Sequence, residues 1–244
     1  MHSPLSVAAS SDRHVVRRDA MFRASRAMLA LEEDIDCALR CDLNVMVSGE
    51  RGVGKAAVAR RIHFESRRVP LVISRPDDAA GELDPAMLDA THGATVLVQD
   101  PERLSPAMQR RLLQFIEERT TRGGPTGRRS VENHGVRFIT ATRGDLFELV
   151  QVQRFDESLF YRLNAIHLVV PPLRARREDI PPLLCHFMSQ FARTAPRLSP
   201  AAWDSIVKYS WPGNICELKA VATSLASIER RMLQPSDLPP EIQR

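Results

Sequence analysis

The chain has 244 residues, of which 43% are hydrophobic, 5% aromatic and 26% charged, and its formal net charge is +4. This length allows a large domain with a smaller one, and the low aromatic content predicts a mostly aliphatic core. No window is long and apolar enough to span a membrane, and no signal peptide precedes Asp19. The mild basic excess permits contact with phosphates, but no aromatic residues interleave with basic ones as a nucleic-acid stacking platform requires. We therefore expect a cytoplasmic protein.

The four cysteines do not predict a metal site. Cys37 and Cys41 lie one helical turn apart, but no second Cys or His pair at zinc-finger spacing accompanies them. We expect four reduced, mostly buried thiols and no metal ligands of this kind.

Strands and helices alternate through the first two thirds of the chain. Residues 1–18 are polar and predict a flexible tail, and apolar residues at helical spacing predict a helix over 20–41. Short apolar runs predict strands over 44–48, 69–74, 95–98, 136–142 and 165–170, with helices over 56–65, 106–119, 146–150 and 157–163. Ser105 is the predicted cap of the second of these helices, and residues 122–135 predict a flexible loop. This alternation predicts a mostly parallel sheet with helices on both faces.

After Pro172 only helices are predicted, over 181–192, 200–209 and 214–232. The chain therefore divides into an α/β core over 19–172 and a small helical domain over 173–244. We interpret the turn that precedes the last helix, Trp211–Asn214, as structural, with Asn214 as the cap of that helix.

Gly49 to Lys55 fits the phosphate-loop pattern G-x-x-x-x-G-K, between a predicted strand and a predicted helix. Glycines allow the backbone to wrap closely around a phosphate, and the amide N–H groups and the helix N-terminus attract the anion. Lys55 would reach the outer phosphates. Phosphate loops generally continue with Ser or Thr, which helps to hold magnesium, but Ala56 occupies that position here.

Five segments in the same order resemble the AAA+ module of bacterial enhancer-binding proteins, the sigma-54-dependent transcription activators. They are GERGVGKAAVARRIHFESRR, GATVLVQDPERLSPAMQRRLLQFIEE, VRFITATRGDL, FDESLFYRLNAIHLVVPPLRARREDIPPLLCHF and LSPAAWDSIVKYSWPGNICELK. The resemblance covers residues 22–242. It implies a RecA-like α/β domain with a helical lid, assembled as a ring that binds ATP between protomers and pushes a GAFTGA loop against sigma-54.

The resemblance also assigns the nucleotide site. ATP or ADP would contact the phosphate loop, composed of Gly49, Glu50, Arg51, Gly52, Val53, Gly54, Lys55 and Ala56. Gln99 stands where the family has its magnesium-binding Asp, and Asp100 stands where it has its catalytic Glu. Magnesium is implied by the family, but a neutral Gln99 weakens its binding, and Asp100 is one methylene shorter than Glu.

Several other family features are altered. The stretch between the second and third predicted strands, within 75–93, is too short to carry a GAFTGA loop. Asp156 replaces the first trans-acting arginine, while Arg162 keeps the second; a structural pairing of Arg162 with an acid is an alternative to a catalytic role. Arg143 stands at the sensor I position, and Cys216 replaces the sensor II arginine. Asp100 and Arg162 are thus the remaining catalytic candidates.

The sequence favours an ATP-binding regulatory module of a transcription regulator that hydrolyses ATP poorly and cannot remodel sigma-54 polymerase. Two alternatives stay open: a working ATPase that uses Asp100, and a nucleotide-independent interaction scaffold. The expected partners are further copies of the chain or an intact AAA+ paralogue in a ring, with RNA polymerase or another regulator as further candidates. The chain shows no DNA-binding domain, and the charged run Arg174, Arg176, Arg177, Glu178 and Asp179 is interpreted as a structural hinge.

Overall fold

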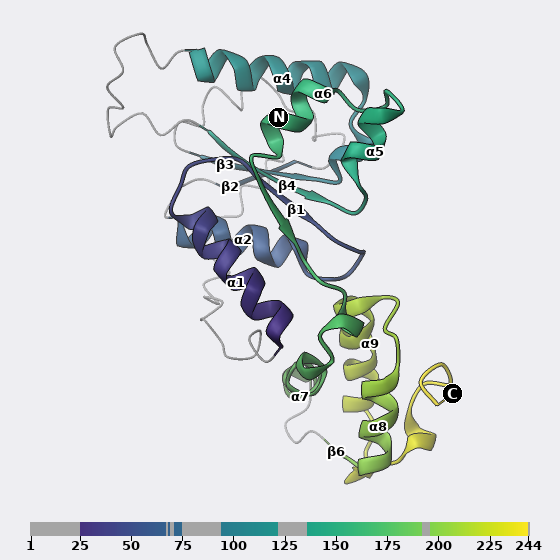
Figure 1. The fold of residues 1–244 in the computed structure, drawn as a ribbon. Coiled ribbons are helices and arrows are strands. Elements are labelled where there is room, and N and C mark those ends of the chain that lie inside the picture. Colours follow the sequence, from purple (N-terminus) through teal and green to yellow (C-terminus); the bar gives the residue numbers. More distant parts are fainter. Residues whose placement is uncertain are drawn as a thin grey trace, which may run out of the picture. The chain divides into compact units, whose positions relative to one another are not determined.

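The structure is a computed structural model that describes residues 25–66, 68, 71–74, 94–121, 136–191 and 196–243 (Figure 1). The predicted tail over 1–18, the segment 75–92 in which a GAFTGA insertion is predicted to be missing, and the predicted loop over 122–135 lie outside these residues. Within the described part of the chain, no helix is both long and apolar enough to cross a membrane.

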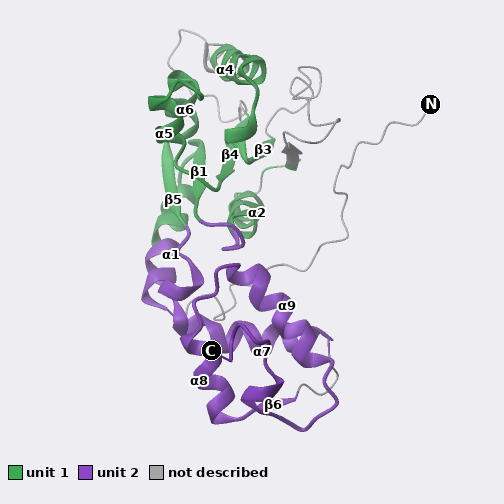
Figure 2. Cartoon of the chain, turned by 90° about the vertical axis from the view of Figure 1, so that its right-hand side faces the viewer, with its two compact units in different colours: residues 1–17, 33–49, 55–169 green, residues 18–32, 50–54, 170–244 purple. Residues whose placement is uncertain are grey.

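The described residues form two compact units, coloured separately in Figure 2. Unit 1 contains the described residues of 33–49 and 55–169, and unit 2 contains those of 18–32, 50–54 and 170–244. Two short elements therefore change units along the sequence: the helix α1 (Arg26–Leu39) and the predicted phosphate loop.

Unit 1 contains a parallel sheet with strand order β2-β3-β4-β1-β5. Its strands are β1 (Val45–Ser48), β2 (Leu71–Ser74), β3 (Thr95–Gln99), β4 (Arg137–Thr142) and β5 (Ile166–Val169). The strand β1 pairs with β4 on one side and β5 on the other, so that Val45 lies opposite both Ile139 and Ile166. The predicted parallel sheet and RecA-like arrangement are confirmed.

Helices cover both faces of this sheet (Figure 1). They are α2 (Lys55–Glu65) on one face and α4 (Pro106–Thr121), α5 (Leu146–Gln151) and α6 (Glu157–Leu163) on the other, with the short 3-10 helix η2 (Pro101–Arg103) after β3. Since alternate strand residues point to opposite faces, Met46, Val96 and Phe138 meet α4 and α6 in one fully apolar cluster. The backbone N–H of Met108 donates to Ser105 Oγ at 3.3 Å, as the predicted cap requires.

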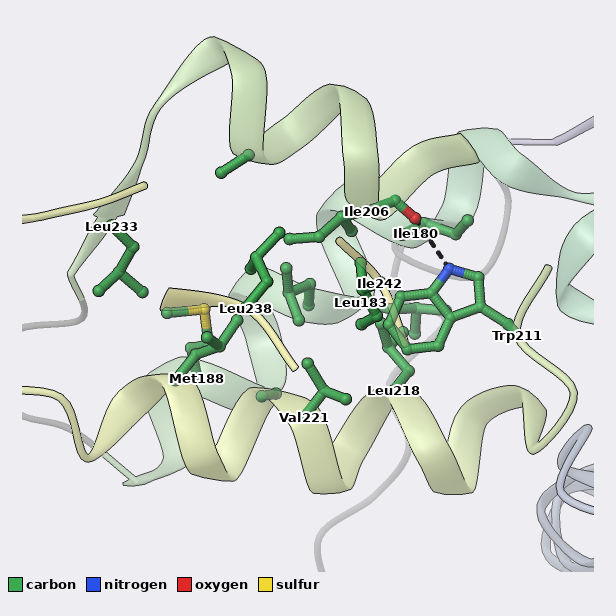
Figure 3. Packing of buried hydrophobic residues seen from close by; sticks show 14 of the residues in the cluster. Ile180, Leu183, Met188, Ile206, Trp211, Leu218, Val221, Leu233, Leu238 and Ile242 are labelled. Carbon is green, nitrogen blue, oxygen red and sulfur yellow. Dashed lines mark hydrogen bonds between the residues drawn. The ribbon is translucent and has the colours of Figure 1, made fainter. Parts of the chain in front are cut away.

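Unit 2 is mainly helical. Its elements are α7 (Ile180–Phe191), α8 (Pro200–Lys208) and α9 (Asn214–Ala226), the 3-10 helices η3 (Leu173–Ala175), η4 (Arg177–Asp179) and η5 (Pro235–Asp237), and the paired strands β6 (Arg197–Leu198) and β7 (Met232–Leu233). Figure 3 shows the side chains of α7, α8 and α9 converging around Trp211, whose Nε1–H donates to Ile206 O at 2.9 Å.

Two predictions for this unit are wrong. The last helix ends at Ala226 instead of Met232, and the residues beyond it pair as β7 with β6, although no strand was predicted after Pro172.

The thiols are free, as predicted, but Cys37, Cys185 and Cys216 are exposed and Cys41 is half-buried, so the expectation of mostly buried thiols is also wrong.

Candidate functional site

The backbone of the predicted phosphate loop takes conformations that glycine favours. Gly49, Gly52 and Gly54 have φ angles of 148°, 80° and 103°. These are positive-φ conformations that side-chain-bearing residues adopt only at a cost. Gly52 also lacks room for a side chain, because a Cβ there would lie 2.3 Å from the carbonyl oxygen of Gly213. The loop thus follows β1 and opens α2 in a conformation that its glycines make possible.

Lys55 is the first residue of α2, and its ammonium group donates to the carbonyl of Gly49 at 2.7 Å. The side chain therefore folds back over the start of the loop. Ala56, the next helix residue, is half-buried and carries no hydroxyl group.

Three consecutive carbonyl groups of the loop accept hydrogen bonds within unit 2. Asn214 Nδ2 donates to Arg51 O at 3.0 Å, and the Ile215 N–H donates to Gly52 O at 2.9 Å. Arg176 Nη2 donates to Val53 O at 2.8 Å. The loop is held through its backbone carbonyl groups, while the Arg51 side chain is exposed and the Val53 side chain is buried.

These contacts fix the direction of the next three amides. In a planar trans peptide the C=O of one residue and the N–H of the next point in opposite directions. The N–H groups of Gly52, Val53 and Gly54 therefore point away from the donors of unit 2, and within the described residues they donate to no protein acceptor. Successive N–H groups in such a loop form a concave site for an anion.

The side chain of Glu50 is also bound within unit 2. Both of its carboxylate oxygens accept from the guanidinium of Arg174, and Asn214 Nδ2 donates to Glu50 Oε2 at 3.1 Å. The hydrogen bond from Arg174, followed by that from Asn214, lowers the pKa of the Glu50 carboxyl from its ordinary 4.5 to about 2. Glu50 is therefore a carboxylate at neutral pH, and its charge is compensated by Arg174.

Asn214 does not cap the last helix, contrary to the prediction. The residue is completely buried, has φ 52°, and follows Gly213, which occupies the cap position. Its Oδ1 accepts from the Leu173 N–H at 2.8 Å, while its Nδ2 serves the loop. The side chain therefore joins the loop to the chain near η3.

Gln99 and Asp100, which stand where the family has its two acids, lie at the carboxyl end of β3. Gln99 is the last residue of the strand, and Asp100 follows in a left-handed conformation, with φ 50° and ψ 54°. Its N–H donates to Ala141 O at 2.9 Å. Its Oδ2 accepts from Arg143 Nη2 at 2.8 Å, so the predicted catalytic acid is paired with the predicted sensor I residue.

The described residues do not fit a magnesium ion held by the protein. Among them, no three His, Cys, Asp or Glu side chains gather as metal ligands. Phosphate-loop NTPases hold magnesium with the loop Ser or Thr and an Asp at the strand end. Here those positions are Ala56 and the neutral Gln99, and the adjacent Asp100 is engaged by a guanidinium.

Asp156, which stands where the family has its first trans-acting arginine, forms the N-terminal cap of α6. Its side chain accepts from the Leu159 N–H at 2.8 Å, and its own N–H donates to Gln109 Oε1 at 2.8 Å. A cap of this kind stabilises a helix by about 1 kcal/mol. A local structural function therefore accounts for this aspartate.

Arg162 lies on α6, where its Nη2 is 3.0 Å from Glu117 Oε1 of α4. The two side chains are 39% and 48% exposed, so solvent screens the pair strongly. The geometry matches the structural alternative, a pairing with an acid, although the partner lies in the same unit. Cys216, in the first turn of α9, is exposed.

Replacing Arg162 with alanine is expected to change the free energy of unfolding by less than about 1 kcal/mol, because exposed ion pairs contribute little. Urea denaturation followed by circular dichroism measures this change, and Glu117→Ala together with the double variant completes a double-mutant cycle. A loss above about 2 kcal/mol would contradict this view of the pair.

Sequence reasoning located the loop but missed the residues that hold it. Arg174, Arg176 and Asn214 were interpreted as parts of a hinge and a turn, because their partners lie more than 120 positions away in the chain. No local pattern reveals such partners. The only signal was the presence of charged and amide side chains in segments that a simple turn does not require.

Known protein families and relatives match the sequence of this chain. The family model described as the sigma-54 interaction domain matches residues 22–173, and the model described as the AAA+ ATPase lid domain matches residues 174–244. The transcriptional regulatory protein ZraR of Klebsiella oxytoca is 35% identical over 250 residues, covering 90% of this chain and 55% of ZraR. The HTH-type transcriptional regulatory protein TyrR of Enterobacter agglomerans is 36% identical over 223 residues, covering 81% of this chain and 42% of TyrR.

Solved structures of other proteins share the fold of this chain. NtrX from Brucella abortus in complex with ATP superimposes with a TM-score of 0.75 at 29% identity, covering 89% of this chain and 56% of NtrX. Its complex with ADP gives 0.74 at 27% identity, covering 90% of this chain and 55% of NtrX. The RuvB branch migration motor of Thermotoga maritima, at 16% identity with a TM-score of 0.57 over 84% of this chain and 65% of RuvB, shares the fold alone. The chain spans about half the length of the curated relatives it matches.

Proposed function

Because the chain belongs to the sigma-54 interaction domain family of AAA+ proteins, we propose that it is an ATP- or ADP-binding regulatory module of a bacterial transcription regulator. Nucleotide would act as a ligand that is turned over poorly. Regulation would proceed through binding partners, without remodelling of sigma-54 polymerase. The proposed inability to remodel sigma-54 polymerase rests on the short sequence between residues 75 and 93, which lies outside the described residues.

The observation that carries this proposal is the backbone of the phosphate loop. Three positive-φ glycines, three amides directed away from the carbonyl contacts, and the Lys55 ammonium at the start of α2 all favour an anion. The complexes of NtrX with ATP and ADP support the choice of nucleotide as that anion.

Poor hydrolysis follows from the end of β3. The neutral Gln99 supplies no negative charge for a metal, and the shorter Asp100 would have to orient the attacking water while it is paired with Arg143. Asp100 is 22% exposed and Arg143 is 48% exposed, so the pair itself can open at little cost. The substitution at Gln99 therefore carries more weight than the pairing. Losing a positioned base typically costs about 100- to 10,000-fold in rate.

The partners belong to the same proposal. A ring of this chain with itself, or with an intact AAA+ paralogue, would place its nucleotide between protomers, and RNA polymerase or another regulator would be the target. The two alternatives, a working ATPase and a nucleotide-independent scaffold, make different predictions for binding and turnover. A cytoplasmic location is part of the proposal.

Titration with a fluorescent ATP analogue, with and without magnesium, tests the binding. We expect saturable binding to the wild-type chain and its loss in Lys55→Ala, because this substitution removes the ammonium group that lies at the start of α2 beside the loop. Lys208→Ala, an exposed lysine paired with Asp204 on α8, is the matched control and should bind normally. An absence of binding at millimolar nucleotide would contradict the proposal and favour the nucleotide-independent interaction scaffold.

A turnover assay with magnesium then separates the two nucleotide-binding functions. We expect phosphate release close to background in both the wild-type chain and Asp100→Asn. Release well above background that disappears in Asp100→Asn would instead establish the working ATPase, since the amide keeps the shape of the side chain but removes its charge.

A further inference from the structure

Unit 2 binds the phosphate loop at every residue from Glu50 to Val53. Arg174 and Asn214 bind the Glu50 carboxylate, and the three donors described above bind the carbonyl groups of Arg51, Gly52 and Val53. Four successive residues of a seven-residue motif are therefore oriented by side chains and one backbone amide that lie far away in the sequence.

Two of these donors are deeply buried. Asn214 is 0% exposed and Arg176 is 1% exposed. Arg176 Nη1 also contacts Met28 Sδ at 2.9 Å, and burial lowers the pKa of its guanidinium. A buried cation without a partner is costly, so the Val53 carbonyl and the guanidinium stabilise each other. The loop conformation is consequently part of the packed interior of unit 2.

Arg174 differs because it is exposed, and its only contact among those described is the two-fold bond to Glu50. An exposed pair contributes little to stability. Its effect is electrostatic, because an acidic side chain sits inside a loop whose amides attract anions. Without the guanidinium, the Glu50 carboxylate would keep its hydrogen bond from Asn214 but lose the compensating charge, and it would repel a phosphate.

We propose that Arg174, Arg176 and Asn214 are positioning residues of the nucleotide site: they keep the loop carbonyls and the Glu50 carboxylate on one side, so that the amides of Gly52, Val53 and Gly54 face the phosphates. This assignment rests on the proposed nucleotide binding. Under this assignment, the segments that contain Arg174, Arg176 and Asn214 directly influence nucleotide affinity, although their sequences resemble a hinge and a turn.

The test is the affinity of Arg174→Gln for the fluorescent ATP analogue. We expect binding to weaken on the order of tenfold, as the loss of one charged hydrogen bond predicts. The unfolding midpoint of unit 2 should stay unchanged. Adding Glu50→Gln to this variant should restore most of the affinity, because the uncompensated charge is then removed. If the contact between Arg174 and Glu50 were merely structural, the second substitution would not restore the affinity, because both the single and the double variant lack this ion pair.

Arg177→Gln is the matched control, because this exposed arginine lies three positions away and should bind within about twofold of wild type. If Arg174→Gln binds like wild type while Lys55→Ala fails to bind, the proposed function stands and the positioning assignment is overturned. If the wild-type chain binds no nucleotide, both are overturned.

A second variant tests Asn214 separately. Asn214→Asp keeps the Oδ1 acceptor for the Leu173 N–H and a residue type that tolerates positive φ, but it removes both donations from Nδ2. We expect a larger loss of affinity than in Arg174→Gln, because a negative charge is added beside Glu50. A folded Asn214→Asp variant, verified by its tryptophan fluorescence, that binds with wild-type affinity would overturn the assignment of this residue.

Discussion

Replacing Trp211 with alanine is expected to lower the free energy of unfolding of unit 2 by about 3–5 kcal/mol, the usual cost of removing a buried tryptophan. The indole is 0% exposed, belongs to the apolar cluster of Figure 3, and donates a buried hydrogen bond to Ile206 O. Alanine would leave a cavity and an unsatisfied carbonyl, without relieving the positive φ of 51° at this position. Urea denaturation followed by fluorescence measures the effect, since the two tryptophans, Trp203 and Trp211, both lie in unit 2.

Trp203→Ala is the matched control for this measurement. Trp203 is only partly buried at the edge of the same cluster, so we expect roughly half the loss or less. Equal losses in the two variants would mean that burial of Trp211 is not what stabilises the unit.

Arg137→Met is expected to destabilise unit 1 by about 2–4 kcal/mol, because two carbonyl groups, one of them in a buried contact, would lose their donor. Arg137 lies in β4, is 1% exposed, and donates to Ala38 O at 2.7 Å and Leu43 O at 2.9 Å. Methionine keeps much of the volume. Part of the loss is offset because the guanidinium, whose Nη1 has no partner among the described residues, is no longer buried.

Hydrogen exchange of the β4 amides reports on unit 1 independently of the fluorescence of unit 2. Arg143→Met is the control, since it makes the same change at an exposed position just beyond the end of β4 and should alter protection by less than about 1 kcal/mol. Unchanged protection in Arg137→Met would show that neither carbonyl depends on this side chain.

The sequence predicted elements whose signals are local. The phosphate loop, β1 and α2 follow one another within about 20 residues, and the glycine spacing marks the turn between them. The cap at Ser105 is likewise a short-range pattern. These features needed no knowledge of distant contacts.

The errors have a common physical cause. The chain after Ala226 contains good helix formers, yet Met232 and Leu233 pair with Arg197 and Leu198, and this distant pairing overrides helix propensity. The buried Asn214 donates to the phosphate loop more than 160 positions away, so the prediction that it caps the last helix was wrong. The left-handed conformation of Asp100 is also set by its surroundings, since aspartate merely tolerates it.

The helix α1 has a practical consequence for dissecting the protein. Ser25, just before it, donates from both its N–H and its hydroxyl group to the Asp179 carboxylate in unit 2, whereas Ala38, near its end, accepts from Arg137 in unit 1. Together with residues 50–54, this makes neither unit a continuous stretch of the chain. A fragment cut at residue 173 would leave the C-terminal piece without Ser25, Met28 and Val53, which are buried in unit 2. Expression of separate pieces should therefore give poorly folded products, and circular permutants that keep both stretches are better suited to studying either unit alone.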